Sequence, residues 1–401
     1  MSPPARVVAN PLAGVAPVWS PYTRAPLDFH RRLAGYEPTP LVDAPALAAR
    51  LDVGRVLIKC ESERLGLPAF KMLGASWATY RAITELLGQE PGPWSSTEQL
   101  AQRVRTLRPF ALAAATDGNH GRAVARMARL LGFDARIFVP TGTTPARIAA
   151  IESEGATVKT VPGDYDAAVS RSAEEAASNC LVISDTSWPG YDQVPRWVIE
   201  GYSTLFWEVA DSIGTAGLEQ PDAVVVPVGV GALAAATVNH WARDEHGRPA
   251  IVGVEPADAD CVMASVQAGG LVTIPGPHHS IMVGLNCGTP SAVAWPLVSA
   301  GVGALVAIDD EWARRAMRDL AALGIEAGET GAASLAGLAA AHHVGLPEAV
   351  GARLGRGTVL LLCTEGATDA ERYRSIVGDR LNAELFGVVG RPPAAGNVSE
   401  V

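Results

Sequence analysis

The sequence predicts an α/β fold built on parallel β-sheets with helices packed on their faces. Short apolar runs rich in β-branched residues alternate along the chain with amphipathic stretches of helical length. Parallel strands need a crossover connection, which is usually a helix, so this alternation indicates repeated βαβ units. Polar or glycine-containing segments follow several of the apolar runs directly. They place the candidate ligand sites at the carboxyl ends of strands.

The expected strands are nine apolar runs of strand length. In chain order they are RVLIKCE, ALAAAT, ARIFVP, TVKTV, LVISD, AVVVPVG, IVGVEP, ALVAIDD and TVLLLCTEG. The stretches between them predict helices over 71–87, 119–131, 145–154, 164–178 and 195–211, one ending near 243, a short one after IVGVEP, and two between 310 and 343. The polar, proline-containing segment EPGPWSSTEQLAQRVRTLRPF interrupts the pattern and predicts a surface excursion.

Charge and hydropathy exclude several classes of function. The 401 residues include 32 basic and 42 acidic side chains, a formal net charge of −10. A nucleic acid or an anionic membrane would require a positive field that this charge opposes. No apolar run reaches the roughly 18 residues of a membrane span, and the start MSPPARVVANPLAG lacks an apolar signal segment. We therefore expect a soluble, cytoplasmic protein with no nucleic-acid or membrane partner.

The cysteines and lysines limit which metal sites and which lysine-dependent reactions the sequence can support. The five cysteines are scattered without a C-x-x-C pair or a nearby histidine spacing, so reduced, buried thiols and no metal site are expected. Only three of the basic residues are lysines: Lys59, Lys71 and Lys159. Arginine stays protonated and cannot replace a lysine amine, so a reaction that needs this amine has three candidates.

Four strand ends carry polar or glycine residues. They are Asp117, Gly118, Asn119, His120 and Gly121 after ALAAAT; Asp185 and Thr186 after LVIS; Gly229, Val230, Gly231, Ala232 and Leu233 after VVVPV; and Thr364, Glu365 and Gly366 after VLLLC. Asp117 and Asn119 also suit the cap of the helix expected there, and Asp185 suits an Asx turn. For His120, local hydrogen bonds at a helix end are preferred over a role as an acid or base. Site and local structural roles both stay open for the two aspartates and the asparagine.

The glycine segment has three interpretations. Gly229, Gly231 and Ala234 fit G-x-G-x-x-A between a strand and a helix, and Glu255 ends the next strand, which matches a dinucleotide site and an NAD-dependent oxidoreductase. More generally, small residues let backbone N–H groups approach any phosphate at a helix N-terminus. The segment therefore indicates a dinucleotide, another phosphorylated cofactor, or close packing of a helix on a strand.

Lys71 is the lysine best placed for chemistry. In GLPAFKMLGAS its small and apolar neighbours predict an amine beside a buried helix start. Burial lowers the pKa of a lysine and makes its neutral amine available for Schiff-base formation. The alternative is an amine that reaches solvent from an ordinary helix. Lys59, in IKCESER, is expected to be more exposed, and Lys159 lies in TVKTV without a nearby site signal.

Six segments together resemble the fold-type II pyridoxal-phosphate enzymes, the group of threonine dehydratase and the tryptophan synthase β subunit. They are AFKMLGAS, ATDGNHGRAVA, PVGVGALAA, VGLNCGTPS, EAGETGAASLAGL and LLCTEGATD, and the similarity runs from about residue 36 to 374. The resemblance implies two open, twisted, mostly parallel sheets flanked by helices, with pyridoxal 5'-phosphate (PLP) in the interdomain cleft. It also implies a homodimer. The expected large domain comprises 36–84 plus 196–385 and the small domain 85–195, with extended or partly disordered termini at 1–35 and 391–401.

The resemblance also assigns roles to residues at the strand ends. Lys71 would form the Schiff base with PLP, and Asn119 would hydrogen-bond its phenolic oxygen. The segment from Gly229 to Leu233 would hold the phosphate. Thr364 would meet the pyridine nitrogen, and its neutral hydroxyl would leave that nitrogen largely unprotonated, which disfavours transamination.

Within this group the sequence is most similar to the diaminopropionate ammonia-lyases. Asp117 stands where dehydratases carry a small hydroxyl residue, and Asp185 in DTSWPGYDQVP matches a second aspartate. The implied reaction eliminates ammonia from D- or L-2,3-diaminopropionate and gives aminoacrylate, then pyruvate and ammonia. Asp117 would take the Cα proton of the D isomer, and Asp185 or the released Lys71 that of the L isomer.

Three residues depart from the pattern of this group. Glu329 and Thr330 in EAGETGAA, and Asn286 in GLNCGTP, stand where smaller residues are expected. They either reshape the pocket near the leaving group or face solvent. A dehydratase, or a β-eliminating or β-replacement enzyme acting on serine, threonine or another β-substituted amino acid, is therefore the alternative function.

Overall fold

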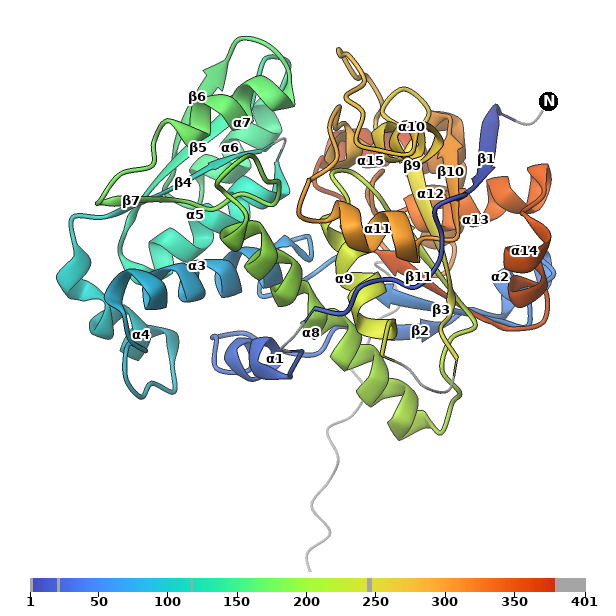
Figure 1. The fold of residues 1–401 in the computed structure, drawn as a ribbon, viewed down its shortest axis with the longest axis horizontal. Helices are drawn as coiled ribbons and strands as arrows, with labels where there is room; N and C mark the ends of the chain where they lie inside the picture. The colour runs from blue at the N-terminus through green and yellow to red at the C-terminus, as the bar shows by residue number, and fades with distance from the viewer. Residues whose placement is uncertain (1–2, 20–21, 117, 244–246, 379–401) are drawn as a thin grey trace, which may run out of the picture.

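The computed structural model describes residues 3–19, 22–116, 118–243 and 247–378. Figure 1 shows two sheets side by side, each covered by helices, with helices α3 (Lys71–Leu87) and α8 (Gln193–Ala216) running between the two halves. This is the predicted α/β fold with two mostly parallel sheets.

The larger sheet has seven strands in the order β1-β10-β9-β8-β11-β3-β2. They are β1 (Ala5–Ala9), β2 (Leu41–Asp43), β3 (Arg55–Cys60), β8 (Ala223–Pro227), β9 (Ala250–Pro256), β10 (Ala304–Ile308) and β11 (Thr358–Cys363). The five central strands are parallel, and the register places Leu360 of β11 beside Val224 of β8 and Leu57 of β3. Helices cover both faces, which explains why these strands are continuous apolar runs.

The smaller sheet has four parallel strands in the order β6-β5-β4-β7. They are β4 (Ala111–Ala115), β5 (Asp134–Pro140), β6 (Thr157–Val161) and β7 (Cys180–Val182). The chain proceeds from β4 to one side and returns to the other side for β7, so the strand order reverses between these two neighbours. Ligands bind at such reversals in open α/β sheets. The domain limits at residues 84 and 195 stay a prediction.

The remaining helices cover the two sheets. They are α1 (Ala25–His30), α2 (Pro45–Arg50), α4 (Thr97–Arg103), α5 (Asn119–Leu131), α6 (Pro145–Glu152), α7 (Tyr165–Ala173), α9 (Ala232–Trp241), α10 (Cys261–Ala268), α11 (Trp295–Gly301), α12 (Asp310–Ala321), α13 (Ala333–Val344), α14 (Glu348–Leu354) and α15 (Ala370–Val377), with 3-10 turns η1 (Arg105–Leu107) and η2 (Val283–Leu285). The helices expected over 71–87 and 119–131 have these bounds. The one expected over 164–178 ends at Ala173, because Ala177 pairs with Cys180 in a bridge that leads into β7.

Helices α3 and α8 approach each other closely at two glycines. A Cβ atom at Gly74 would lie 2.5 Å from Cε1 of Tyr202, and one at Gly201 would lie 2.5 Å from the carbonyl oxygen of Leu73. Larger residues would push the helices apart. Because α3 begins at Lys71, this packing also fixes the position of the lysine at the start of the helix.

The N-terminal segment, for which the sequence indicated no element, contributes an edge strand. Strand β1 pairs antiparallel with β10, with Ala5 beside Ile308. The side chain of Asn10 continues the attachment, because its Nδ2 donates to the carbonyl oxygens of Val302 at 2.6 Å and Ser299 at 2.8 Å. Residues 5–10 are thus held along the larger sheet.

Lys59 is fully buried, so the expectation of an exposed position was wrong. Its Nζ donates to Oε2 of Glu208 at 2.6 Å, and Arg64 pairs with both Glu208 and Glu61. A buried charge is tolerated when it is paired and hydrogen-bonded, as each of these groups is. The cluster joins β3 to α8. The amine of Lys59 is thus engaged in a structural ion pair.

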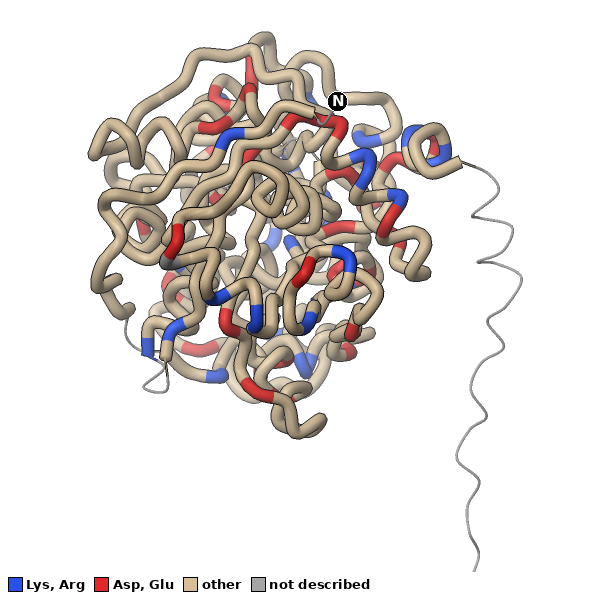
Figure 2. The backbone as a smooth tube through the Cα atoms, turned by 90° about the vertical axis from the view of Figure 1, so that its right-hand side faces the viewer, with Lys and Arg blue, Asp and Glu red and all other residues tan. Residues whose placement is uncertain are grey.

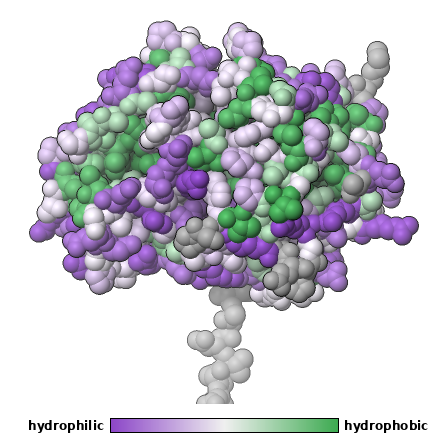
Figure 3. Space-filling model, viewed as in Figure 1, coloured by the Kyte–Doolittle hydropathy of each residue, from purple (hydrophilic) through white to green (hydrophobic). Residues whose placement is uncertain are grey.

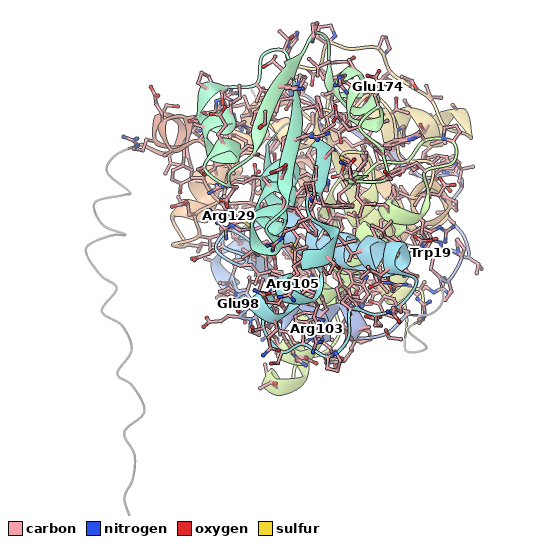
Figure 4. All side chains as sticks on the ribbon, turned by 90° about the vertical axis from the view of Figure 1, so that its left-hand side faces the viewer. Trp19, Glu98, Arg103, Arg105, Arg129 and Glu174 are labelled. Carbon is pink, nitrogen blue, oxygen red and sulfur yellow. The ribbon has the colours of Figure 1, made fainter. Side chains whose placement is uncertain are left out.

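The surface agrees with the low charge density of the sequence. Acidic and basic residues are interspersed along the chain in Figure 2, and Figure 3 shows apolar patches separated by hydrophilic residues. The expected excursion around residues 90–110 contains α4 and η1, where Figure 4 labels Glu98, Arg103 and Arg105 together at the periphery. The five cysteines are buried and unbridged. Within the described ranges, no helix has the length and apolar character needed to cross a bilayer.

Candidate active site

A cavity lies where the carboxyl ends of β4 and β7 face those of β8 and β11. Its walls are formed by Phe70, Lys71, Thr116, Asn119, His120, Arg147, Tyr165, Asp185, Pro227, Gly229, Val230, Gly231, Ala232, Leu233, Gly284, Leu285, Cys287, Thr330, Thr364 and Glu365. Nearly every site residue expected from the sequence lines this cavity; Asp117 lies outside the described residues.

Lys71 is the first residue of α3 and extends into the cavity. Its side chain is 21% exposed, and Nζ donates to Oδ2 of Asp185 at 2.6 Å. The next residues, Met72 and Leu73, are buried. The helix start is therefore apolar, as expected, while the amine itself points to a carboxylate.

Asp185 follows β7 and is 4% exposed. Besides Lys71, it accepts a hydrogen bond from the hydroxyl of Tyr165 at 3.1 Å, and Nδ1 of His120 lies 3.9 Å from its Oδ2. Burial acts to raise the pKa of Asp185, but the charges of Lys71 and His120 and the hydrogen bonds from Lys71 and Tyr165 outweigh it, so the pKa is lowered. The carboxylate is thus held ionised beside the amine.

Asn119 and His120 occupy the start of α5. Nδ2 of Asn119 donates to Oε2 of Glu365, so this side chain contacts the opposite wall of the cavity. Nε2 of His120 lies 2.8 Å from the carbonyl oxygen of Ile183, which follows β7 and is 63 residues away, so this contact is not the local hydrogen bond expected for the histidine.

The glycine segment connects β8 to α9. Gly231 precedes the helix with φ of +95°, a conformation that favours glycine. A Cβ atom at Gly229 would lie 3.2 Å from both Sγ of Cys287 and the carbonyl oxygen of Gly284. The small residues therefore bring the first backbone N–H groups of α9 to the cavity wall, where an anion is favoured.

Glu255 argues against a dinucleotide at this segment. It is fully buried, and its two carboxylate oxygens accept the backbone N–H groups of Val262 and Met263, each at 2.8 Å. These contacts occupy the carboxylate at the start of α10, so it cannot bind a ribose. The glycine segment thus fits a phosphate without the acidic partner that a dinucleotide site uses.

Thr364 and Glu365 extend from the end of β11 into the cavity wall. Oγ1 of Thr364 lies 3.4 Å from the carbonyl oxygen of Thr330, and Glu365 accepts the backbone N–H of Thr330 at 3.1 Å. Burial raises the pKa of Glu365, against the opposing charge of Arg147. The sequence placed Glu365 at this strand end but indicated no role for it. The sequence analysis missed Tyr165, which reaches the site from the start of α7 without a motif of its own.

Glu329, Thr330 and Asn286, the residues that differ from the pattern of the resembled group, have different surroundings. Thr330 lines the cavity, and Glu329 beside it is buried, with Oε1 3.7 Å from Nε of Arg372. Neither side chain is exposed to solvent. Asn286 is half-buried, and its Nδ2 donates to the carbonyl oxygen of Ser280 at 2.9 Å, within its own loop. Only Thr330 can reshape the cavity directly.

The side chains around the cavity suit pyridoxal 5'-phosphate. Lys71 offers an amine, the segment from Gly229 to Leu233 offers helix N-terminal N–H groups for a phosphate, and Asn119 and Thr364 offer an amide and a neutral hydroxyl. These groups come from both sheets and converge on one cavity. The fold and the cavity together define the class of PLP-dependent α/β enzymes.

Comparison with known proteins identifies the family. The family model described as pyridoxal-phosphate dependent enzyme matches residues 33–363, and the chain belongs to this family. It is a homologue of the diaminopropionate ammonia-lyases: it is 34% identical over 366 residues to the diaminopropionate ammonia-lyase of Escherichia coli K12, covering 88% of this chain and 91% of that protein. The cofactor is therefore PLP, and the chain is a PLP-dependent β-eliminating lyase.

Two solved structures of the Escherichia coli diaminopropionate ammonia-lyase extend the similarity to three dimensions. The complex with D-serine has a TM-score of 0.83 and 30% identity, covering 94% of this chain and 98% of that one. The complex with an aminoacrylate-PLP azomethine reaction intermediate has a TM-score of 0.81 and 31% identity, with the same coverage.

Proposed function

We propose that the chain eliminates the β-amino group of D- or L-2,3-diaminopropionate. Overall, one substrate molecule and one water give pyruvate and two ammonia. The observation that carries the proposal is the 2.6 Å contact between Nζ of Lys71 and Oδ2 of Asp185 in the cavity wall. It pairs a Schiff-base amine with a carboxylate that can accept a proton. The similarity to diaminopropionate ammonia-lyases over most of the chain supports the choice of substrate.

The residues around the cavity divide the binding of PLP among them. Nζ of Lys71 would attach the cofactor, and the N–H groups of the segment from Gly229 to Leu233 would hold its phosphate. Asn119 would donate to the phenolic oxygen, and Thr364 would meet the pyridine nitrogen. Bound PLP supplies an electron sink for the charge that develops when the Cα–H bond breaks.

Asp185 and Lys71 would control the proton at Cα. While Lys71 is an ammonium group, its charge lowers the pKa of Asp185 and keeps the carboxylate a weak base. Once the lysine amine is engaged and uncharged, that stabilisation is lost and Asp185 becomes a stronger base. The carboxylate or the released Lys71 amine then takes the Cα proton of the L isomer. Such positioned groups contribute roughly 10²–10⁴ in rate.

Elimination from both the D and the L isomer of 2,3-diaminopropionate would require a second carboxylate. The segment after β4 reaches the cavity through Thr116 and Asn119, and the segment after its neighbour β7 reaches it through Asp185. We assign the Cα proton of the D isomer to Asp117. Two bases from separate strands could serve the two faces of one bound substrate.

The Asp185 carboxylate in the cavity wall favours an amino leaving group. A carboxylate can anchor or protonate a cationic β-amine, whereas a hydroxyl suits a substrate that loses hydroxide. Elimination of the β-hydroxyl of serine is the second candidate, because a relative of 30% identity is described in complex with D-serine.

Pyruvate production by the purified PLP-loaded protein tests the proposal. The substrates are D- and L-2,3-diaminopropionate, D- and L-serine, and L-threonine as a control. We expect kcat/KM for diaminopropionate to exceed that for serine by roughly 10²-fold or more, since the cavity would recognise the charged β-amine. Equal or faster turnover of serine would establish the second candidate. Sedimentation velocity of the same preparation tests the predicted homodimer.

A further inference from the structure

A second buried carboxylate lies in the cavity wall and takes no part in the proposed reaction. Glu365 follows Thr364 at the end of β11, is 3% exposed and lines the cavity. A buried carboxylate is destabilising unless its oxygens are hydrogen-bonded. Its partners therefore indicate what this side chain does.

Both oxygens of Glu365 accept hydrogen bonds from segments distant in sequence. Oε1 accepts the backbone N–H of Thr330 at 3.1 Å, and Oε2 accepts Nδ2 of Asn119. The backbone is held too, because the N–H of Gly328 donates to the carbonyl oxygen of Glu365 at 3.1 Å. A Cβ atom at Gly331 would overlap that same oxygen. Glu365 is thus a rigid acceptor presented to Asn119.

Glu365 is buried among charges of both signs. Burial raises its pKa, and the nearby Glu329 adds to the rise, but the positive charge of Arg147 and the hydrogen bonds from Thr330 oppose it. Arg147 lines the same cavity. The ionised form therefore has a cation to offset its burial.

We propose that Glu365 is a positioning residue that fixes the orientation of the Asn119 amide, and through it the hydrogen bond from Asn119 to the phenolic oxygen of PLP. This inference rests on the role proposed for Asn119. An amide can turn over and exchange its nitrogen and oxygen with little change in shape. A carboxylate only accepts hydrogen bonds, so it selects the amide nitrogen and leaves the second N–H of Asn119 for the cofactor.

The Glu365→Gln variant removes this selection while keeping the size of the side chain. Its own amide can donate to Oδ1 of Asn119, so both orientations of Asn119 become available. We expect the visible absorbance of bound PLP to change its pH dependence, since the phenolic oxygen is no longer reliably hydrogen-bonded. We also expect about tenfold weaker PLP binding, the effect of losing one hydrogen bond.

Glu200→Gln is the matched control. Glu200 is a half-buried carboxylate that accepts Nε1 of Trp77 at 2.8 Å, and it lies outside the cavity wall. We expect the absorbance and PLP affinity of this variant to equal those of the parent protein. A shift of the same size in both variants would overturn the inference, because it would reflect a general effect of burying an amide.

A double-mutant cycle with Asn119→Ala tests whether Glu365 acts through the asparagine. We expect Glu365→Gln to cause no further change in absorbance or PLP affinity once Asn119 is replaced. An equal change in both backgrounds would overturn the inference, as would a Glu365→Gln variant identical to the parent. If Asn119→Ala itself changes nothing, the role of Asn119 fails and this inference with it, whereas pyruvate production tests the reaction separately.

A second substitution keeps the test decisive if Glu365→Gln does not fold. Glu365→Asp retains the carboxylate but withdraws it by one methylene, which removes the contact with Asn119. The expected result is the same change in absorbance and affinity. Thermal unfolding identifies which variants are folded, and an unchanged spectrum in a folded Glu365→Asp protein would contradict the proposal.

Discussion

Lys71 and Asp185 lie 114 residues apart in the sequence, yet Nζ of the lysine is 2.6 Å from Oδ2 of the aspartate. One residue starts α3, which follows strand β3 of the larger sheet, and the other follows β7 of the smaller sheet. The contact therefore depends on how the two sheets face each other. It also couples the charge of the amine to the basicity of the carboxylate.

Replacement of Lys71 by alanine is expected to abolish turnover and covalent attachment of PLP. The substitution removes the amine of the Schiff base, and the loss in kcat should be on the order of 10⁴-fold, the upper end for a positioned acid or base. Lys159→Ala is the control, since this lysine is exposed on β6. Pyruvate assays and absorbance spectra of both variants check the prediction. Normal turnover by Lys71→Ala would rule out its proposed role.

Substitution of Asp185 and of Asp117 should affect turnover of the two isomers differently. Asp185→Asn is expected to slow elimination from L-2,3-diaminopropionate by roughly 10²–10⁴-fold while leaving the D isomer less affected, because the amide cannot accept the Cα proton. Asp117→Asn should show the opposite preference. The measurement is kcat for each isomer with each variant.

Equal losses for both isomers in both variants would contradict this division of roles. That result would indicate that the aspartates act together, and that the released Lys71 amine takes the proton. The hydrogen-bond partner Tyr165 provides a control, because Tyr165→Phe removes only one donor to Asp185. We expect it to slow the L isomer by less than Asp185→Asn does.

Most of the fold was predictable because its strands are long apolar runs covered on both faces. The two strands that sequence reasoning missed, β1 and β2, lie at the edges of the larger sheet and are partly exposed. Such strands lack a continuous apolar run, since one face or one edge meets solvent. β2 is also only three residues long.

The candidate site was predictable where a motif follows a strand. Lys71, Asn119, Asp185 and Thr364 were selected in this way, and the structure brings them to one cavity, while their roles stay proposals. Glu365 could not be distinguished from a buried structural carboxylate, because its partners belong to segments distant in sequence. Tertiary contacts alone reveal its place in the site.

Glu255 is expected to make the free energy of unfolding depend on pH. Burial raises its pKa to about 8, with Asp260 adding to the rise and the backbone N–H groups of Val262 and Met263, and Arg6, opposing it. A glutamate in the unfolded chain has a pKa of about 4.3. The stabilising contribution is therefore complete below this pKa and is lost as the pH rises toward 8, by at most about 1.4 kcal/mol per pH unit.

Glu255→Gln is expected to remove this part of the pH dependence, because its amide does not titrate. Urea unfolding of the parent and the variant, measured at several pH values across the window, gives the two slopes of free energy against pH. The variant should show the shallower slope whatever its absolute stability. Parallel slopes would mean that Glu255 keeps the same charge in the folded and unfolded chains.

Gly231 should be intolerant of a side chain. Its φ of +95° is strained for alanine, a penalty of about 1–2 kcal/mol, and relief of the strain would move the first N–H groups of α9 away from the phosphate position. We expect Gly231→Ala to lower the free energy of unfolding by this amount and to weaken PLP binding. Urea unfolding and PLP titration measure the two effects.

Gly214→Ala is the control for Gly231→Ala, because this glycine substitution is expected to stabilise the protein. Gly214 lies within α8, and a Cβ atom there would meet nothing within 4 Å. Alanine should stabilise the helix by roughly 0.5–1 kcal/mol, because it restricts the unfolded chain more than glycine does, and PLP affinity should not change. A Gly231→Ala protein with the stability and PLP affinity of the parent would show that the turn before α9 adapts to a side chain, and that the phosphate is held elsewhere.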